Sequence, residues 1–181
     1  LIPGLDGTIV FDVVRYNDFA TNQQLKEVAS GQVTTEADAQ LWQYRIDPKT
    51  AKILDAQCLV DRHCELPVAL GEDTEAVTYM NVHATAATPP GELFGAIARF
   101  DSKTDLTFAD AGAGCYPSEP IPVPNPGNPQ QPWVLTVVYN GHHHRSEVWI
   151  YRGDDLGAGP ICRLGLPQVV AHSFHGTWVG E

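Results

Sequence analysis

The chain has 181 residues, and its 22 acidic side chains against 11 basic ones give a formal net charge of −11. This balance argues against nucleic-acid binding, which needs Lys and Arg on the phosphates. With 16 Gly and 14 Pro the chain stays below the roughly 25–30% typical of low-complexity disorder, and no apolar run approaches the ~20 residues of a membrane span.

Short apolar and β-branched runs bounded by Gly, Pro, Asn or Asp dominate the chain and predict β-strands. Examples of these runs are Thr8–Tyr16, Leu41–Asp47, Glu75–Val82, Leu93–Asp101, Trp133–Tyr139 and Glu147–Arg152. One short helix is predicted over Asp18–Ser30, because Asp18 can cap its start and Gly31 can end it. A further helical turn is expected over Thr35–Asp38, and Pro117–Pro132 is expected to be an extended surface excursion.

A short sequence recurs along the chain. Residues 45–50 (Arg-Ile-Asp-Pro-Lys-Thr) resemble residues 99–104 (Arg-Phe-Asp-Ser-Lys-Thr), and residues 151–154 are a fainter third copy. A strand-built period near 50 residues is typical of the blades of a β-propeller. We therefore predict an all-β fold of about three and a half blades, fewer than the ~4–8 with which propellers close.

Two glutamates and one histidine keep nearly the same period. Glu65 and Glu119 are 54 positions apart, and His175 follows 56 positions later. Equivalent positions on successive blades face one another around the propeller axis, so these side chains are expected to converge. A carboxylate beside an imidazole is the arrangement that orients a metal-ligating histidine. The spacing alone leaves the alternatives open that His175 is structural and that the glutamates are solvated loop carboxylates.

Several motifs resemble the carotenoid cleavage oxygenases, a family that includes carotenoid, apocarotenoid and stilbene dioxygenases and a retinoid isomerase. The motifs are Gly159-Pro160-Ile161-Cys162-Arg163-Leu164, Phe174-His175-Gly176-Thr177-Trp178, the strand Trp133–Tyr139 followed by His144-Arg145-Ser146-Glu147, Glu119-Pro120, and Glu65-Leu66-Pro67. They stand in family order over most of the chain. The last 50 residues carry the most specific part of the resemblance.

The resemblance implies a seven-bladed β-propeller with a non-haem Fe(II) on its axis, held by four histidines with glutamates around them. By motif, His175 resembles the last iron ligand, and Glu65 and Glu119 resemble two of the supporting glutamates. Glu119 is expected to orient His175, and Glu65 to support a histidine outside this sequence. The implied reaction inserts O₂ across a conjugated C=C bond of a carotenoid or apocarotenoid, an apolar polyene, and gives two carbonyl products.

Residues 1–181 are accordingly expected to be the C-terminal part of a single propeller domain, completed by a missing N-terminal half that carries the other three histidine ligands. The start at Leu1 and the single methionine, Met80, agree with a processed or truncated piece. The isolated chain is expected to be inactive. Two alternatives stay open: a non-catalytic propeller-like interaction module, and a retinoid-type isomerase of the same family.

The remaining side chains of note are assigned structural roles. His142–His144 are expected in an exposed hairpin loop, the acidic residues 72–75 in a solvated turn, and the four tryptophans in packing positions. His172 stands where the family tends to have an aromatic residue, and on a strand it would face the side opposite His175. The four cysteines have no zinc or redox spacing and are expected to be free thiols of a reducing compartment. We therefore expect a cytoplasmic protein (plastidial for a plant source), with peripheral membrane contact as one option.

Overall fold

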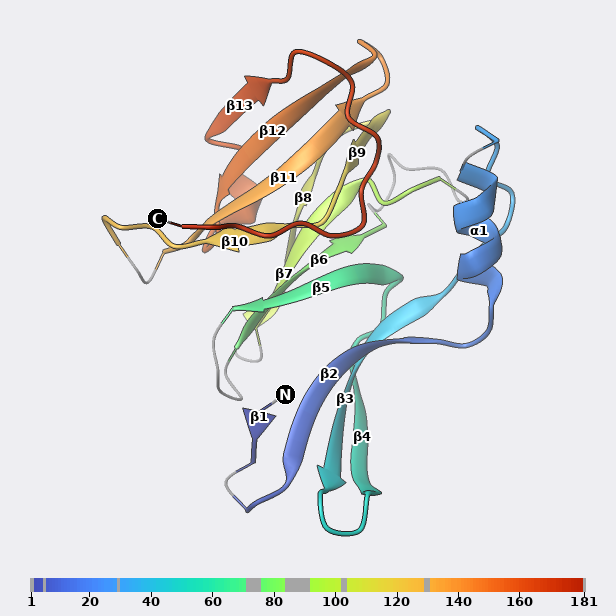
Figure 1. The fold of residues 1–181 in the computed structure, drawn as a ribbon, viewed down its shortest axis with the longest axis vertical. Coiled ribbons are helices and arrows are strands. Elements are labelled where there is room, and N and C mark those ends of the chain that lie inside the picture. The colour runs from blue at the N-terminus through green and yellow to red at the C-terminus, as the bar shows by residue number, and fades with distance from the viewer. Residues whose placement is uncertain are drawn as a thin grey trace.

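The computed structural model describes residues 2–4, 6–28, 30–70, 76–83, 92–101, 104–128 and 131–180. These residues form three antiparallel sheets, one α-helix and one short 3₁₀ helix (Figure 1). The first sheet holds β1 (Ile2–Pro3), β2 (Ile9–Tyr16), β3 (Ala39–Asp47) and β4 (Lys52–Val60). The second holds β5 (Cys64–Leu70), β6 (Val77–Val82), β7 (Ala96–Asp101) and β8 (Thr104–Asp110). The third holds β9 (Cys115–Pro117), β10 (Ile121–Val123), β11 (Trp133–Asn140), β12 (Arg145–Arg152) and β13 (Cys162–Gly165).

The prediction of a mostly β chain is confirmed, and each predicted strand coincides with an observed one. Within each sheet the strands pair in chain order, so each sheet is a simple meander. The repeated sequence falls at the same place in all three meanders, after β3, β7 and β12, where the chain turns into the last strand of the sheet. Residues 102–103 of the second copy lie outside the described part of the chain. The sequence period is therefore the length of one sheet.

The helix α1 (Ala20–Val28) confirms the predicted one and is slightly shorter. The Ala20 backbone N–H donates to Asp18 Oδ1 at 2.8 Å, and Gly31 adopts a positive φ of 74° just beyond the end of the helix. The expected helical turn over Thr35–Asp38 is wrong, because this segment is irregular. The Glu27 carboxylate accepts the backbone N–H of Thr35 at 2.8 Å, so that donor bonds a side chain instead of a helical carbonyl.

The expected surface excursion over Pro117–Pro132 is wrong at its start. Strands β9 and β10 both pair with β11 and together make an interrupted first strand of the third sheet. Pro117 is fully buried, and Ser118 and Glu119 are 5% and 8% exposed. Prolines are tolerated here because this strand is the edge of its sheet, where a missing N–H breaks few ladder bonds.

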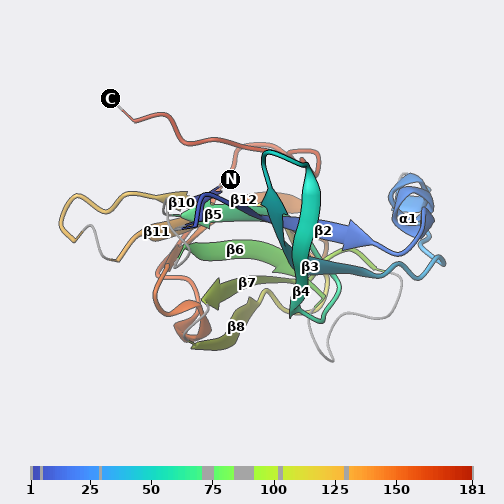
Figure 2. The same cartoon turned by 90° about the horizontal axis from the view of Figure 1, so that it is seen from below.

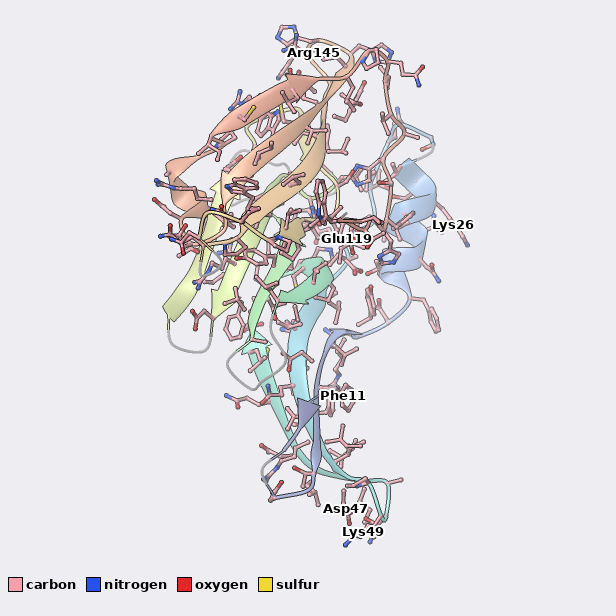
Figure 3. The ribbon with its side chains drawn as sticks, turned by 60° about the vertical axis from the view of Figure 1, so that its left-hand side comes forward. Phe11, Lys26, Asp47, Lys49, Glu119 and Arg145 are labelled. Carbon is pink, nitrogen blue, oxygen red and sulfur yellow. The ribbon has the colours of Figure 1, made fainter. Side chains whose placement is uncertain are left out.

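The second sheet lies between the other two and shares a hydrophobic cluster with each (Figures 1 and 2). Toward the third sheet, Tyr79 and Ile97 pack with Val134, Val138 and Trp149. Toward the first sheet, the cluster consists of Leu41, Val60, Cys64, Met80, Val82, Ala96 and Ala98. The far end of the first sheet projects from this body, with Asp47 and Lys49 near its tip and Phe11 partway along it (Figure 3).

Several smaller expectations can be compared with the structure. The turn 141–144 exposes His142–His144 as expected, and the four cysteines are free thiols. Among the tryptophans Trp149 is buried, whereas Trp133 and Trp178 are 37% and 51% exposed, so the packing assignment is wrong for those two. The acidic turn at 72–75 lies outside the described residues. Within the described ranges, no helix combines the length and hydrophobicity that crossing a bilayer requires.

Candidate functional site

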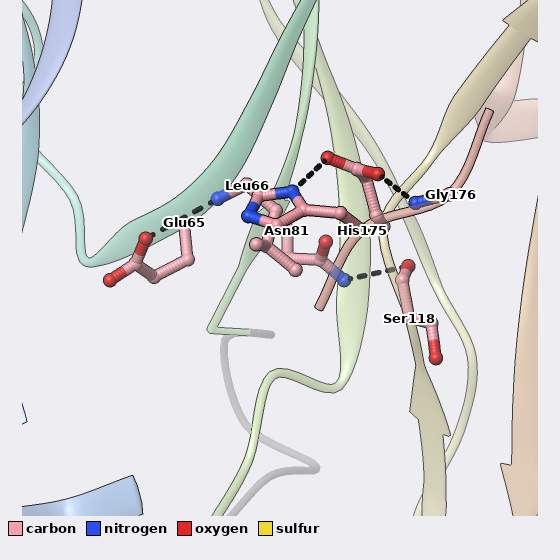
Figure 4. A network of polar contacts seen from close by, with 7 residues as sticks. Glu65, Leu66, Asn81, Ser118, His175 and Gly176 are labelled. Atoms are coloured by element: carbon pink, nitrogen blue, oxygen red, sulfur yellow. Dashed lines mark hydrogen bonds and ion pairs between the residues drawn. The ribbon is translucent and has the colours of Figure 1, made fainter. Parts of the chain in front are cut away.

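Glu119 lies in the gap between β9 and β10, at the break in the first strand of the third sheet. Its Oε1 is 3.1 Å from His175 Nδ1, and its Oε2 accepts the Gly176 backbone N–H at 2.7 Å (Figure 4). Both oxygens of one buried carboxylate therefore hold the same two-residue segment. The expected contact between Glu119 and His175 is present in the structure.

His175 belongs to an irregular segment, residues 166–180, that runs from the outer strand β13 back to β10 (Figure 1). Ser146 anchors this segment, accepting the Leu166 N–H on its carbonyl at 2.9 Å and the Val170 N–H on its hydroxyl at 3.0 Å. The His175 side chain is 78% exposed. Because Nδ1 faces Glu119, Nε2 is the nitrogen available to bind another group. A β-carbon on Gly176 would lie 2.7 Å from Ile121 Cδ1, so glycine permits this close approach to β10.

Glu65 is the second residue of β5, in the first strand of the second sheet. The strand is irregular between Glu65 and Val68, where Leu66 has a positive φ of 52°. The Tyr16 hydroxyl donates to Glu65 Oε1, and the Leu66 N–H lies 3.4 Å from Oε2. Burial raises the pKa of Glu65, while the Tyr16 hydrogen bond and, more weakly, the nearby His175 oppose that rise. The imidazole of His175 lies between the two carboxylates (Figure 4).

The two glutamates thus occupy equivalent positions, each at an interruption in the first strand of consecutive sheets. This equivalence gives their 54-residue spacing a structural cause. The structure brings His175 into contact with Glu119 and near Glu65, as the spacing predicts. Within the part of the chain that the structure describes, no three His, Cys, Asp or Glu side chains are grouped so as to hold a metal ion. An imidazole with Nδ1 on a carboxylate and Nε2 open has the chemistry of a metal ligand. His175 therefore fits the role of one metal ligand, and the described residues do not group further ligands around it.

Tyr16 is a member of the site that the sequence did not reveal. It ends β2 in the first sheet, and its hydroxyl reaches across to Glu65 in the second. The expected partner of Glu65 was a histidine outside the sequence; within the described residues its side-chain partner is this phenol. Burial and the adjacent Glu65 carboxylate raise the pKa of Tyr16, so the hydroxyl remains protonated and donates. The hydrophobic pattern of β2 marks Tyr16 only as a strand residue.

A cavity of about 240 Å³ opens beside these residues. Its walls include Glu65 and His175 and are otherwise largely apolar, with Leu25, Leu66, Leu93, Phe94 and Phe174. His172 lines the same cavity, so the expectation that it faces away from His175 is wrong. That expectation assumed a strand, whereas residues 171–173 are irregular and the side-chain alternation of a strand does not apply.

The chain belongs to the family described as retinal pigment epithelial membrane protein (RPE65), whose model matches residues 4–180. The chain is 30% identical over 181 residues to the apocarotenoid-15,15′-oxygenase of Synechocystis, and 27% identical over 189 residues to the carotenoid isomerooxygenase of Galleria mellonella. Each match covers 96% of this chain and 36% or 37% of the relative.

Solved structures agree with this assignment. Cobalt-substituted Synechocystis apocarotenoid oxygenase aligns with a TM-score of 0.80 at 26% identity, covering 98% of this chain and 38% of that one. A chimera of that oxygenase and RPE65 aligns with a TM-score of 0.78 at 24% identity, covering the same shares, and supports the fold alone. The chain thus spans little more than a third of the length of its relatives.

Proposed function

We propose that this chain is the C-terminal part of a non-haem Fe(II)-dependent oxygenase that cleaves a conjugated C=C bond of a carotenoid or apocarotenoid with O₂, giving aldehyde or ketone products. The observation that carries the proposal is the contact of Glu119 with both His175 Nδ1 and the Gly176 N–H, at 3.1 and 2.7 Å. A carboxylate on Nδ1 fixes the tautomer and directs Nε2 outward, as a metal ligand requires.

Each residue of the site has a definite task in this proposal. His175 would bind iron through Nε2, Glu119 would orient its ring, and Glu65 would support a further histidine ligand from outside this chain. When bound by neutral imidazoles with open positions, Fe(II) supplies the activation of O₂. The apolar walls contributed by Leu66 and Phe174 exclude water and receive a polyene. The relative named as an apocarotenoid oxygenase supports this substrate class.

One histidine cannot hold iron tightly, so the remaining three ligands come from outside this chain. The three sheets are proposed as three blades of a seven-bladed propeller, and the rest of the propeller carries those ligands. The isolated chain is then inactive. We also propose that the protein is cytoplasmic and contacts membranes peripherally to collect its apolar substrate.

A chimera tests the proposal. Residues 1–181 would replace the matching C-terminal part of the Synechocystis oxygenase, and Fe(II) content and apocarotenal cleavage would be measured. We expect an active, iron-loaded chimera whose activity falls at least about 100-fold with His175→Ala. His143→Ala, on the exposed turn, is the matched control and should leave activity unchanged. A folded chimera that binds iron but is inactive, or an active His175→Ala variant, would contradict the proposal.

The other two functions give different results in the same system. A non-catalytic interaction module would yield a folded chimera without cleavage at any iron concentration. A retinoid-type isomerase would isomerise a polyene without cleaving it. The similarity to the carotenoid isomerooxygenase of Galleria mellonella is the reason to test this alternative. Product analysis under ¹⁸O₂ separates these outcomes, since cleavage places label in the carbonyl products. Purified residues 1–181 that bound stoichiometric Fe(II) and cleaved an apocarotenal would show that the isolated chain is not inactive.

A further inference from the structure

His172 lies where two cavities meet. The smaller cavity, about 240 Å³, contains Glu65 and His175 in its wall. A larger one, about 750 Å³, lies toward the end of α1 and the turn between β11 and β12. Leu93 and His172 line both cavities, so these two side chains form the partition between them. A ligand long enough to enter both cavities passes over His172.

The ring of His172 has no hydrogen-bond partner among the described residues. Its Nδ1 is buried and unpaired. Buried polar atoms in proteins are nearly always paired, so an unpaired ring is unusual at this position. The ring lines both cavities, and Nε2, which is not among the buried unpaired atoms, is the nitrogen that a ligand there can reach. Burial lowers the pKa of His172, which keeps the imidazole neutral, with one donor and one acceptor nitrogen.

Other polar groups of the larger cavity are already paired. The Tyr116 hydroxyl donates to Glu92 Oε2 at 2.7 Å, and Tyr139 is hydrogen-bonded to His144 Nδ1 at 2.8 Å. The partition itself is apolar apart from His172, because Leu93 is its other member. A polar group of a ligand that reaches the partition therefore meets the imidazole.

We infer that His172 hydrogen-bonds an oxygen atom, hydroxyl or carbonyl, carried by a polyene that occupies the two cavities, and so selects oxygenated apocarotenoids over hydrocarbons. This inference rests on the proposed function for its polyene ligand. A neutral imidazole can donate to a carbonyl or accept from a hydroxyl, so either group satisfies it. A hydrocarbon end would leave the ring unpaired and would bind less well.

Binding to the 181-residue chain tests the inference, because residues of this chain line both cavities. The probes are a C20 polyene alcohol and the C20 hydrocarbon in which CH₃ replaces CH₂OH, and the readout is quenching of tryptophan fluorescence without iron. We expect the chain to bind the alcohol about 10-fold more tightly. His172→Phe should reduce this preference to within 2-fold while the hydrocarbon binds as before. His172→Asn, which keeps a donor and an acceptor, should retain part of it.

Three results would overturn the inference: an equal preference in the chain and in His172→Phe, no preference in the unmodified chain, or no binding of either probe. Circular dichroism of each variant shows whether its sheets are intact, and His143→Phe on the exposed turn is the matched control. The proposed function is tested separately by cleavage in the chimera. If the 181-residue chain prefers the alcohol but the chimera does not cleave apocarotenals, the inference about His172 stands and the proposed function fails. If the chimera cleaves apocarotenals but the 181-residue chain shows no preference, the proposed function stands and the inference fails.

Discussion

Glu119 and Glu65 occupy the same place in neighbouring sheets, at the break in the first strand, yet their carboxylates have different partners. Glu119 is buried and uses both oxygens on the His175–Gly176 segment. Glu65 is half-buried and is held by a hydroxyl from another sheet, Tyr16, and by a long contact to the Leu66 N–H. The difference shows that one repeated position can use both carboxylate oxygens on a single segment while its counterpart binds a hydroxyl from another sheet.

Among variants that separate the two glutamate positions, the largest effect is expected for Glu119→Ala. Removal of this carboxylate frees the His175 ring and leaves the Gly176 N–H without its acceptor, so we expect a 10–100-fold loss of cleavage activity and of iron affinity in the chimera. Steady-state kinetics and metal analysis check this. Glu36→Ala removes an exposed carboxylate and is the control. If Glu119→Ala reduced activity no more than Glu36→Ala does, the Glu119 carboxylate would not be needed to orient His175, and the prediction would be wrong.

Asn81 supports the Glu119 side alone. Its buried amide donates to the carbonyls of Pro117 and Ser118 at 2.9 and 3.1 Å and so fixes the strand break from the neighbouring sheet. We expect Asn81→Ala to lower the free energy of unfolding by about 2 kcal/mol, since two buried acceptors lose their donor. Urea denaturation measures this, with Asn22→Ala on the exposed face of α1 expected within about 0.5 kcal/mol of wild type. If Asn81→Ala changed the free energy of unfolding by no more than about 0.5 kcal/mol, the Asn81 amide would not stabilise the strand break.

A smaller effect is expected for Glu65→Gln, and it depends on pH. Burial raises the pKa of Glu65 in the folded chain, so the fold favours the protonated carboxyl. This contribution to stability is complete below the ordinary value of about 4.5 and is lost as pH rises through the raised folded value. Glu65→Gln cannot ionise and should lack that loss. Unfolding measured from pH 4 to pH 8 checks it, and parallel curves for both proteins would contradict the prediction.

The smallest effect is expected for Tyr16→Phe. The ring stays in the cavity wall while Glu65 loses one donor, so cleavage in the chimera should fall less than 5-fold, far less than for Glu119→Ala. Tyr44→Phe removes a hydroxyl from a stacked pair in the projecting part of the first sheet and serves as the control. A loss as large as that of Glu119→Ala would mean that the Glu65 side is held as firmly as the other.

Much of the fold and half of the site could be predicted from the sequence. The hydrophobic runs predicted the strands β2, β3, β6, β7, β11 and β12, and the period of about 54 residues matched one sheet. The same period brought out Glu65, Glu119 and His175, because the residues of a repeated strand break keep the spacing of the repeat. The site contact that was expected, Glu119 with His175, is a contact between segments that this period relates.

The parts that could not be predicted depend on contacts between distant segments. Strand β5 contains Glu65 and Pro67 in its first half, which interrupts the pattern of a strand, and β10 lies in a proline-rich run. Their strand conformation comes from pairing with β6 and β11, not from local preference. Tyr16 and His172 carry no signal in the sequence either, because their roles depend on residues that lie close to them only in the folded chain.

The irregular segment that carries His175 has a consequence for the dynamics of the site. It lies outside the three meanders, and within the described part of the chain it is anchored by bonds to Ser146 and to Glu119. Segments with few buried contacts open at a lower free energy than the sheets they cover. This arm can therefore detach and reattach while both hydrophobic clusters stay folded, and its amide protons should exchange with solvent long before those of β6 or β11. His175 would then leave and rejoin the site by local opening, without unfolding of the protein.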